Sequence, residues 1–82
     1  MLDWVRTDTA LTRTFTFASF PDAIAFVTRL GFYAERVNHH PDIDVRYSTV
    51  TVTWSTHDVG GLTEKDEAAV TATDGLYGER VS

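Results

Sequence analysis

Apolar and polar residues alternate along two stretches of this 82-residue chain, as they do in β-strands that bury one face. In the first stretch, residues 10–17, threonines form one face and the other face carries Leu11, Arg13, Phe15 and Phe17. In the second stretch the apolar face carries Val50, Val52 and Trp54. We expect each strand to pair with a shorter neighbour in an antiparallel hairpin, formed by residues 2–7 through a turn at 7–9 and by residues 43–47.

Between the predicted hairpins the spacing of apolar residues changes to three and four, which is the period of an amphipathic α-helix. The apolar stripe consists of Ala23, Phe26, Val27, Leu30, Ala34 and Val37. Pro21 is favoured in the first turn of such a helix. A second helix is predicted from Thr63 and Asp66, which have the spacing of an N-terminal capping box. We expect this second helix to end or fray at Asp74-Gly75.

The resulting order of elements is β-β-α-β-β-α. It predicts an α+β fold, a two-layer sandwich in which the helices cover one face of a four-stranded antiparallel sheet. We expect residues 1–82 to form a single domain, because no repeat, linker or low-complexity segment interrupts the pattern. A chain of this length buries only about 60–65% of the surface that its unfolded form exposes. The core is therefore small, and self-association would stabilise it.

The composition excludes several classes of function. Cysteine is absent, so the chain has neither disulfides nor thiolate ligands for a metal. The net charge of −5, from 7 basic and 12 acidic residues, disfavours nucleic-acid binding, which depends on basic patches. The first residues lack the pattern of a signal peptide, and no apolar run approaches the roughly 20 residues that span a membrane. We therefore expect a cytoplasmic protein that binds neither nucleic acid nor membranes.

The three histidines of the chain lie in two short segments, Asn38-His39-His40-Pro41 and Thr56-His57-Asp58. An unperturbed imidazole has a pKa of about 6.5, so a convergent set of imidazoles favours acid/base chemistry. Pro41 disfavours a helical conformation at His40. The first helix must therefore end near this pair, and the two adjacent side chains point to different sides. His57 follows the last strand and could approach one of them across the fold.

Simpler roles compete for these residues. A histidine near a helix C-terminus is favoured by the helix dipole alone. A zinc site is also conceivable, because acceptable ligand types are present at His39, His40, His57 and Asp58. However, adjacent histidines suit a single ion poorly and the His-x-x-x-His spacing is missing, so we expect no metal site. Asp66 could cap its helix, support a site or do both, and these roles stay open.

The spacing of these residues resembles that of a known family. Three, five, nine and eight residues separate Glu35, His39-His40-Pro41, Tyr47, His57 and Asp66, and this pattern is similar to that of the pterin-4a-carbinolamine dehydratases. The resemblance extends over roughly residues 4–74. It implies the same fold with one further N-terminal helix, for which this sequence has no residues, and association into homodimers or homotetramers.

The resemblance also implies an activity, the dehydration of 4a-hydroxytetrahydropterin to the quinonoid dihydropterin. This step recycles the reduced pterin used by aromatic amino acid hydroxylases, and it takes no cofactor and no metal. As catalytic residues, His40 and His57 would form the acid/base pair at the 4a-hydroxyl and N5, while His39 binds and orients the ring. The substrate-binding residues would be Pro41, Thr56, Asp58 and Val59.

Glu35 and Asp66 would support this site. Glu35 lies one helical turn before His39 and either orients that imidazole or pairs at the surface with Arg29 or Arg36, and we slightly favour the surface pair. The alternatives to an enzyme are a non-enzymatic dimerisation or scaffold module and a pterin-binding module of the same fold.

Two aromatic residues each have two possible roles. Tyr47 and Trp54 could each pack in the core or offer a ring to a flat ligand. We expect both to belong to the core.

Overall fold

The computed structural model describes residues 3–56 and 61–78. Six elements follow one another in the described residues: β1 (Val5–Arg6), β2 (Leu11–Thr16), α1 (Phe20–Val37), β3 (Asp42–Arg46), β4 (Thr49–Trp54) and α2 (Glu64–Gly78). This order confirms the β-β-α-β-β-α arrangement expected from the sequence.

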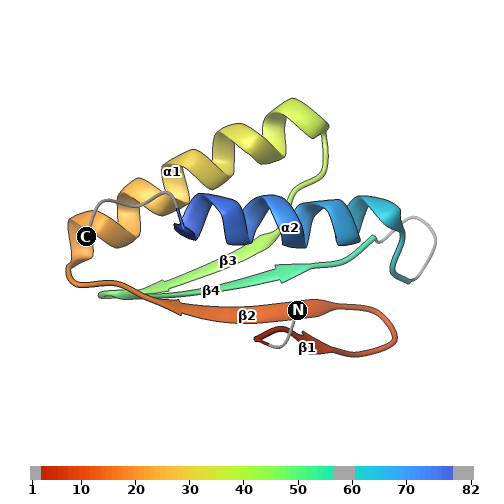
Figure 1. Cartoon of the computed structure of the whole chain (residues 1–82), viewed down its shortest axis with the longest axis horizontal. Coiled ribbons are helices and arrows are strands. Elements are labelled where there is room, and N and C mark those ends of the chain that lie inside the picture. Colours follow the sequence, from red (N-terminus) through yellow and green to blue (C-terminus); the bar gives the residue numbers. More distant parts are fainter. Residues whose placement is uncertain (1–2, 57–60, 79–82) are drawn as a thin grey trace.

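The four strands form one antiparallel sheet in the order β1-β2-β4-β3. The longest pairing joins the two hairpins through the centre of the sheet, where Leu11 of β2 lies opposite Trp54 of β4 and Thr16 lies opposite Thr49. Both helices cover the same face of the sheet (Figure 1). The two-layer α+β sandwich is therefore confirmed.

The strand faces follow the alternation of the sequence. The face beneath the helices is apolar, and the core consists of Trp4, Leu11, Phe15, Ala23, Phe26, Leu30, Ala34, Val50, Val52, Trp54, Ala69 and Val70. The opposite face carries threonines, whose hydroxyls pair across β2 and β4 at Thr12–Thr53 (3.2 Å) and Thr14–Thr51 (3.0 Å). Burial of one face thus fixes the register of the two central strands.

Local capping sets both ends of α1. The Ser19 hydroxyl accepts the backbone N–H of Asp22 at 3.3 Å, and Pro21 occupies the first turn. At the other end Asn38 is left-handed with a φ of 53°, a conformation that asparagine tolerates better than most residues. The chain therefore leaves the helix at Asn38, just before the adjacent histidines, as the proline predicted.

Helix α2 extends further than expected. It runs to Gly78 instead of ending or fraying at Asp74-Gly75, so that prediction was wrong. The Asp74 carboxylate accepts the Trp4 indole N–H at 2.9 Å and an Arg13 guanidinium N–H at 2.7 Å. Leu76 and Tyr77 pack against the core. These tertiary contacts offset the roughly 1 kcal/mol that a glycine costs inside a helix.

Tyr47 does not belong to the core, whereas Trp54 does. Tyr47 is 73% exposed and begins the two-residue turn between β3 and β4, with a φ of 54°. Since β3 ends at Arg46, the turn interrupts the alternation that would have buried Tyr47. Trp54 is fully buried, as expected.

Candidate active site

The end of α1 separates the two adjacent histidines. The His39 backbone N–H donates to the Ala34 carbonyl at 3.1 Å, which holds the chain against the last turn of the helix. The His39 side chain is only 11% exposed, whereas that of His40 is 57% exposed. The two imidazoles therefore occupy different environments, as Pro41 led us to expect.

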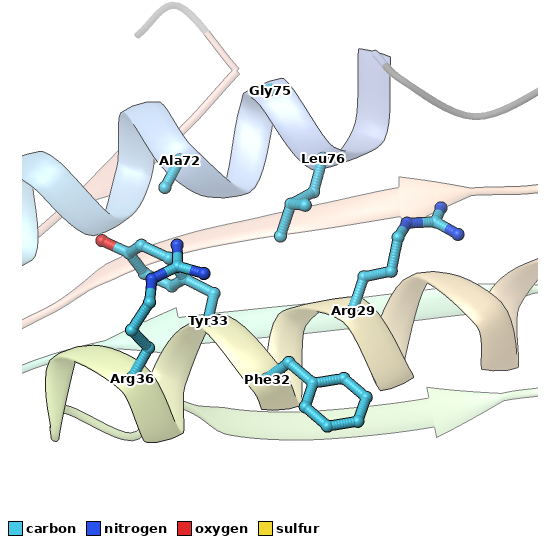
Figure 2. A pocket seen from close by; sticks show the side chains of 7 residues that line it. All are labelled: Arg29, Phe32, Tyr33, Arg36, Ala72, Gly75 and Leu76. Atoms are coloured by element: carbon cyan, nitrogen blue, oxygen red, sulfur yellow. The ribbon is translucent and has the colours of Figure 1, made fainter.

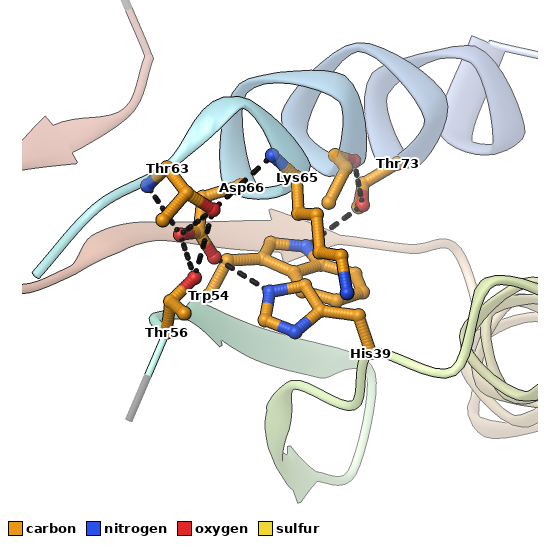
Figure 3. A network of polar contacts seen from close by, with 8 residues as sticks. His39, Trp54, Thr56, Thr63, Lys65, Asp66 and Thr73 are labelled. Atoms are coloured by element: carbon orange, nitrogen blue, oxygen red, sulfur yellow. Dashed lines mark hydrogen bonds and ion pairs between the residues drawn. The ribbon is translucent and has the colours of Figure 1, made fainter. Parts of the chain in front are cut away.

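His39 belongs to a polar network centred on Asp66 (Figure 3). Asp66 is fully buried at the start of α2, and its Oδ1 lies 2.7 Å from His39 Nε2. The other oxygen, Oδ2, accepts the Thr56 hydroxyl and, at 3.0 Å, the backbone N–H of Thr63. One carboxylate thus joins the end of α1, the segment after β4 and the start of α2.

Asp66 combines the two roles that the sequence left open. The bond from the Thr63 N–H is the reciprocal bond of a capping box, and the Thr63 hydroxyl accepts the Lys65 N–H at 3.2 Å. The same carboxylate contacts an imidazole. Capping and contact with His39 are therefore compatible.

The surroundings of Asp66 keep its carboxyl charged. Burial alone raises its pKa, but hydrogen bonds from Thr56, His39 and the Thr63 backbone N–H, together with the positive charge of His39, outweigh burial and lower that pKa below its ordinary value. An ionised carboxylate can only accept hydrogen bonds, so Nε2 of His39 carries a proton. The other ring nitrogen, Nδ1, accepts a hydrogen bond when the ring is neutral and donates one when the ring is protonated.

The ring of His39 has a second neighbour in Trp54. The two rings are stacked, with centroids 5.2 Å apart and planes inclined by 29°. The Trp54 indole N–H donates to the Thr73 hydroxyl at 3.0 Å, and that hydroxyl donates to the Ala69 carbonyl at 2.6 Å. The stack is therefore anchored in the middle of α2.

His40 pairs with Glu35 at the surface. Its Nε2 lies 2.9 Å from Glu35 Oε1, and the Glu35 side chain is 82% exposed. Glu35 thus neither contacts His39 nor pairs with Arg29 or Arg36, so the expected partners were wrong, although its place at the surface is confirmed. The left-handed turn at Asn38 brings His40 back over the last turn of α1.

A cavity of about 350 Å³ opens beside Thr56, which also belongs to the Asp66 network. Its walls come from the ends of the strands and the segments next to them: Thr9, Ala10, Asp42, Thr53, Ser55, Thr56 and Gly61. Pro41, half-buried, directly precedes Asp42 of this wall. His57, Asp58 and Val59, three of the predicted site residues, lie outside the described residues.

Two other cavities lie among the helices. One of about 220 Å³ borders His39 and is otherwise lined by Tyr33, Val37, Lys65 and Ala68. The larger, of about 460 Å³, lies between α1 and α2 and is lined by Arg29, Phe32, Tyr33, Arg36, Ala72, Gly75 and Leu76 (Figure 2). Because neither histidine nor carboxylate lines the larger cavity, its walls do not offer the acid/base groups found around Asp66.

Within residues 3–56 and 61–78, no three histidine or acidic side chains gather in a way that could hold a metal ion. None of the helices in the same residues is long and apolar enough to cross a membrane.

The sequence did not identify Thr73 as a residue of the site. It placed Trp54 in the core but did not predict its contact with His39. Thr73 is fully buried and extends the stripe Asp66, Ala69 and Val70 along the inner face of α2. A polar residue on such a stripe needs a hydrogen-bond partner, and this is the signal that could have identified it. For Trp54 the core assignment was right, but its contact with a candidate site residue could not be read from one strand.

The sequence and the fold both match known proteins. The family profile described as pterin 4 alpha carbinolamine dehydratase matches residues 1–76. A Chloroflexus aurantiacus protein assigned by name to the pterin-4-alpha-carbinolamine dehydratases is 53% identical over 76 residues, which cover 93% of this chain and 82% of that protein. A Nocardia farcinica protein of the same assigned name is 55% identical over 64 residues, covering 78% and 67% of the two chains.

Two solved structures share the fold. A transcriptional coactivator/pterin dehydratase from Brucella melitensis superimposes with a TM-score of 0.87 at 32% identity, over 92% of this chain and 82% of that one. A pterin dehydratase-like RuBisCO assembly factor of the alpha-carboxysome superimposes with a TM-score of 0.77 over 94% and 89% of the chains, but at 23% identity this likeness concerns the fold alone. The extent of the profile match and the identity to these relatives lead to one conclusion: the chain belongs to the pterin 4 alpha carbinolamine dehydratase family.

Proposed function

We propose that this protein dehydrates 4a-hydroxytetrahydropterin to the quinonoid dihydropterin and so recycles the reduced pterin. The observation that carries the proposal is the pair of adjacent histidines in two different environments, His39 fixed by buried Asp66 and His40 open to solvent. Two relatives that are 53% and 55% identical to this chain carry the name pterin-4-alpha-carbinolamine dehydratase, and this supports a pterin substrate. The cytoplasmic location and the single-domain extent expected from the sequence stay predictions.

The reaction needs two proton transfers. A base removes the proton from N5, the C4a–N5 double bond forms, and the bond from C4a to its hydroxyl breaks. An acid protonates the departing hydroxyl, which leaves as water. Each positioned proton transfer typically accelerates such a reaction by about 10²–10⁴-fold, and imidazoles can do both near neutral pH.

The two environments suit different tasks. His40 is mostly exposed, so it can exchange its proton with solvent between turnovers, and we assign it to the acid/base pair with His57. His39 is held through Nε2 by Asp66, and Nδ1 lies on the ring edge that points away from Asp66 (Figure 3). A ring nitrogen held in place in this way suits binding and orienting the substrate ring.

The cavity beside Thr56 is a candidate for one part of the substrate, while His39 faces the separate cavity of about 220 Å³. Its volume of about 350 Å³ falls within the range of about 300–1,000 Å³ that is typical of small-molecule sites. The hydroxyls of Thr53 and Thr56 and the carboxylate of Asp42 are acceptors for the N–H groups of a pterin. We assign substrate binding to Pro41 and Thr56 on this side, together with Asp58 and Val59.

The test is the dehydration rate of enzymatically generated 4a-hydroxytetrahydropterin, followed by ultraviolet absorbance against the spontaneous background. We expect the wild type to accelerate the reaction, and His40→Ala and His57→Ala each to lower kcat by about 10²-fold or more while the circular dichroism stays unchanged. Arg46→Ala is the matched control, because the Arg46 side chain is exposed at the far end of β3 and pairs with Asp44. A folded wild type without acceleration would overturn the proposal and favour a non-enzymatic scaffold or pterin-binding module.

The proposal includes self-association into a homodimer or homotetramer. Phe32, on the outer face of α1, is 73% exposed, and it lines the groove that Tyr33 and Leu76 also line (Figure 2). An exposed aromatic side chain beside a groove lined by aromatic, aliphatic and arginine side chains is typical of an interface. Light scattering should give a multiple of 9.2 kDa for the wild type and a smaller particle for Phe32→Asp. A monomeric wild type at high concentration would contradict this part of the proposal.

A further inference from the structure

His39 has two restraints, and the bond to Asp66 is only one of them. A single hydrogen bond restrains Nε2, but coupled changes in χ1 and χ2 that keep Nε2 within hydrogen-bonding distance of the carboxylate can still tilt the ring. Turning the ring moves Nδ1, the atom that would meet the substrate. Something else must therefore hold the plane of the imidazole.

The stack on Trp54 supplies this second restraint. The two ring planes lie within 29° of each other at a centroid distance of 5.2 Å, so the indole blocks rotation of the imidazole on one side. An indole face also attracts an imidazolium more strongly than an aliphatic surface does. Both effects act on the orientation of His39 and not on its distance from Asp66.

Trp54 is itself held by a hydrogen bond as well as by core packing. It is fully buried, the ring of Tyr33 meets it edge-on at 6.2 Å and 85°, and its N–H is bonded to the Thr73 hydroxyl at 3.0 Å. Thr73 is also fully buried, and its own hydroxyl proton goes to the Ala69 carbonyl at 2.6 Å. The Thr73 oxygen is therefore oriented to accept, and the indole plane is set by a residue of α2 that does not touch His39.

We propose that Trp54 is a positioning residue for His39 and that Thr73 anchors it, so that the middle of α2 sets the direction of His39 Nδ1. The kinetic consequence of this brace rests on the proposed dehydratase function, whereas the structural consequence does not. A brace of this kind acts on kcat more than on KM, because a small misorientation harms the reacting geometry before it harms binding.

The test compares substitutions at two threonines of α2. Thr73→Val keeps the shape of the side chain and removes the acceptor for the indole N–H, while Thr73→Ser keeps the hydroxyl. Thr71→Val is the matched control, because the Thr71 hydroxyl also bonds a carbonyl one turn earlier, that of Glu67 at 3.4 Å, but faces solvent. The readouts are the ¹⁵N and ¹H shifts of the His39 ring by NMR and the kcat and KM of dehydration.

We expect Thr73→Val to change the ¹⁵N and ¹H chemical shifts of the His39 ring, which report its tautomer and its stacking on the indole. We also expect it to lower kcat by about tenfold with little change in KM. Thr73→Ser should keep the wild-type chemical shifts and rate, and Thr71→Val should change neither. A Thr73→Val variant that melts at lower temperature but keeps the wild-type His39 shifts would overturn the brace and leave Thr73 a purely structural residue. If Thr73→Val does not fold, Trp54→Phe removes the same N–H and is judged by the same shifts.

The two proposals fail in distinguishable ways. An inactive wild type would overturn the dehydratase function, while the NMR shifts would still decide the brace. If the wild type is active but the His39 chemical shifts are the same in Thr73→Val as in the wild type, only the brace is overturned.

Discussion

Two histidine–carboxylate pairs lie next to each other in this protein, and they differ in almost everything except distance. His39 Nε2 lies 2.7 Å from Asp66, with side chains 11% and 0% exposed, and His40 Nε2 lies 2.9 Å from Glu35, with side chains 57% and 82% exposed. The contact distance alone therefore says little about what either pair does. Burial and the number of further partners separate them.

The buried pair is expected to fix a geometry, and the surface pair is not. Removing one partner of a buried ion pair typically costs about 3–5 kcal/mol, because the other charge is left without compensation. An exposed pair contributes only about 0–1 kcal/mol. Asp66 also accepts bonds from Thr56 and Thr63, so its loss would loosen three segments at once. Adjacent residues can thus combine a fixed imidazole with a freely exchanging one.

The largest effect expected is on stability when the two carboxylates are replaced by their amides. Asp66→Asn offers one oxygen where the carboxylate offered two, so at least one donor among His39, Thr56 and Thr63 loses its acceptor. We expect the free energy of unfolding to fall by about 3 kcal/mol for Asp66→Asn and by less than about 1 kcal/mol for Glu35→Gln. Urea unfolding followed by circular dichroism measures both, and equal losses would erase the distinction between the pairs.

The pH dependence of the buried pair has a definite sign. Because folding lowers the pKa of Asp66, its charged form stabilises the native state at neutral pH, and this contribution is lost as the pH falls below the ordinary carboxyl value of 3.8 towards the lower native pKa. The difference in unfolding free energy between wild type and Asp66→Asn should therefore narrow as the pH falls below about 4. Urea titrations across this range test it, and a difference that widens in acid would show the opposite sign.

A smaller effect is expected from the hydroxyl that supports the carboxylate. Thr56→Val removes one of the donors to Asp66 Oδ2 and leaves the His39 contact in place. We expect a loss of about 1–2 kcal/mol in unfolding free energy, since a hydrogen bond to a charged group is lost. Thr53→Val is the control, because the Thr53 hydroxyl pairs with Thr12 on the open face of the sheet. Equal losses at both positions would mean that the charge of Asp66 does not matter.

The smallest effect concerns the surface pair itself. A double-mutant cycle of Glu35→Gln and His40→Ala should give a coupling energy below about 1 kcal/mol, which falls further as salt rises from about 0.05 M to about 0.5 M. The coupling energy from the corresponding cycle of Asp66→Asn and His39→Ala should be larger and nearly independent of salt. A surface coupling that matches the buried one would contradict the comparison.

Much of the fold could be predicted, because one buried face per strand leaves a clear period in the sequence. The alternations around Phe15 and Val52 gave the strands, and the spacing around Leu30 gave α1. The failures have local causes: alternation does not mark where a hairpin turns, so Tyr47 was misplaced, and a glycine inside α2 did not end it because later residues pack on the core.

The candidate site was predictable in its members but not in its contacts. The spacing pointed to Asp66 and to both adjacent histidines, yet it placed Glu35 beside His39 or an arginine. The left-handed residue after α1, which reverses the direction of the chain, brings His40 to Glu35 instead. The anchor at Thr73 depends on a contact between β4 and α2, and such long-range contacts leave no period in the sequence.

The most direct test of the comparison is the kcat for dehydration of 4a-hydroxytetrahydropterin, measured in one assay for the wild type, Asp66→Asn and Glu35→Gln. We expect Asp66→Asn to lower kcat by at least about tenfold, because the orientation of His39 is lost, and Glu35→Gln to lower it by less than about threefold. Equal losses for the two variants, or a larger loss for Glu35→Gln, would contradict the claim that the buried pair orients the site.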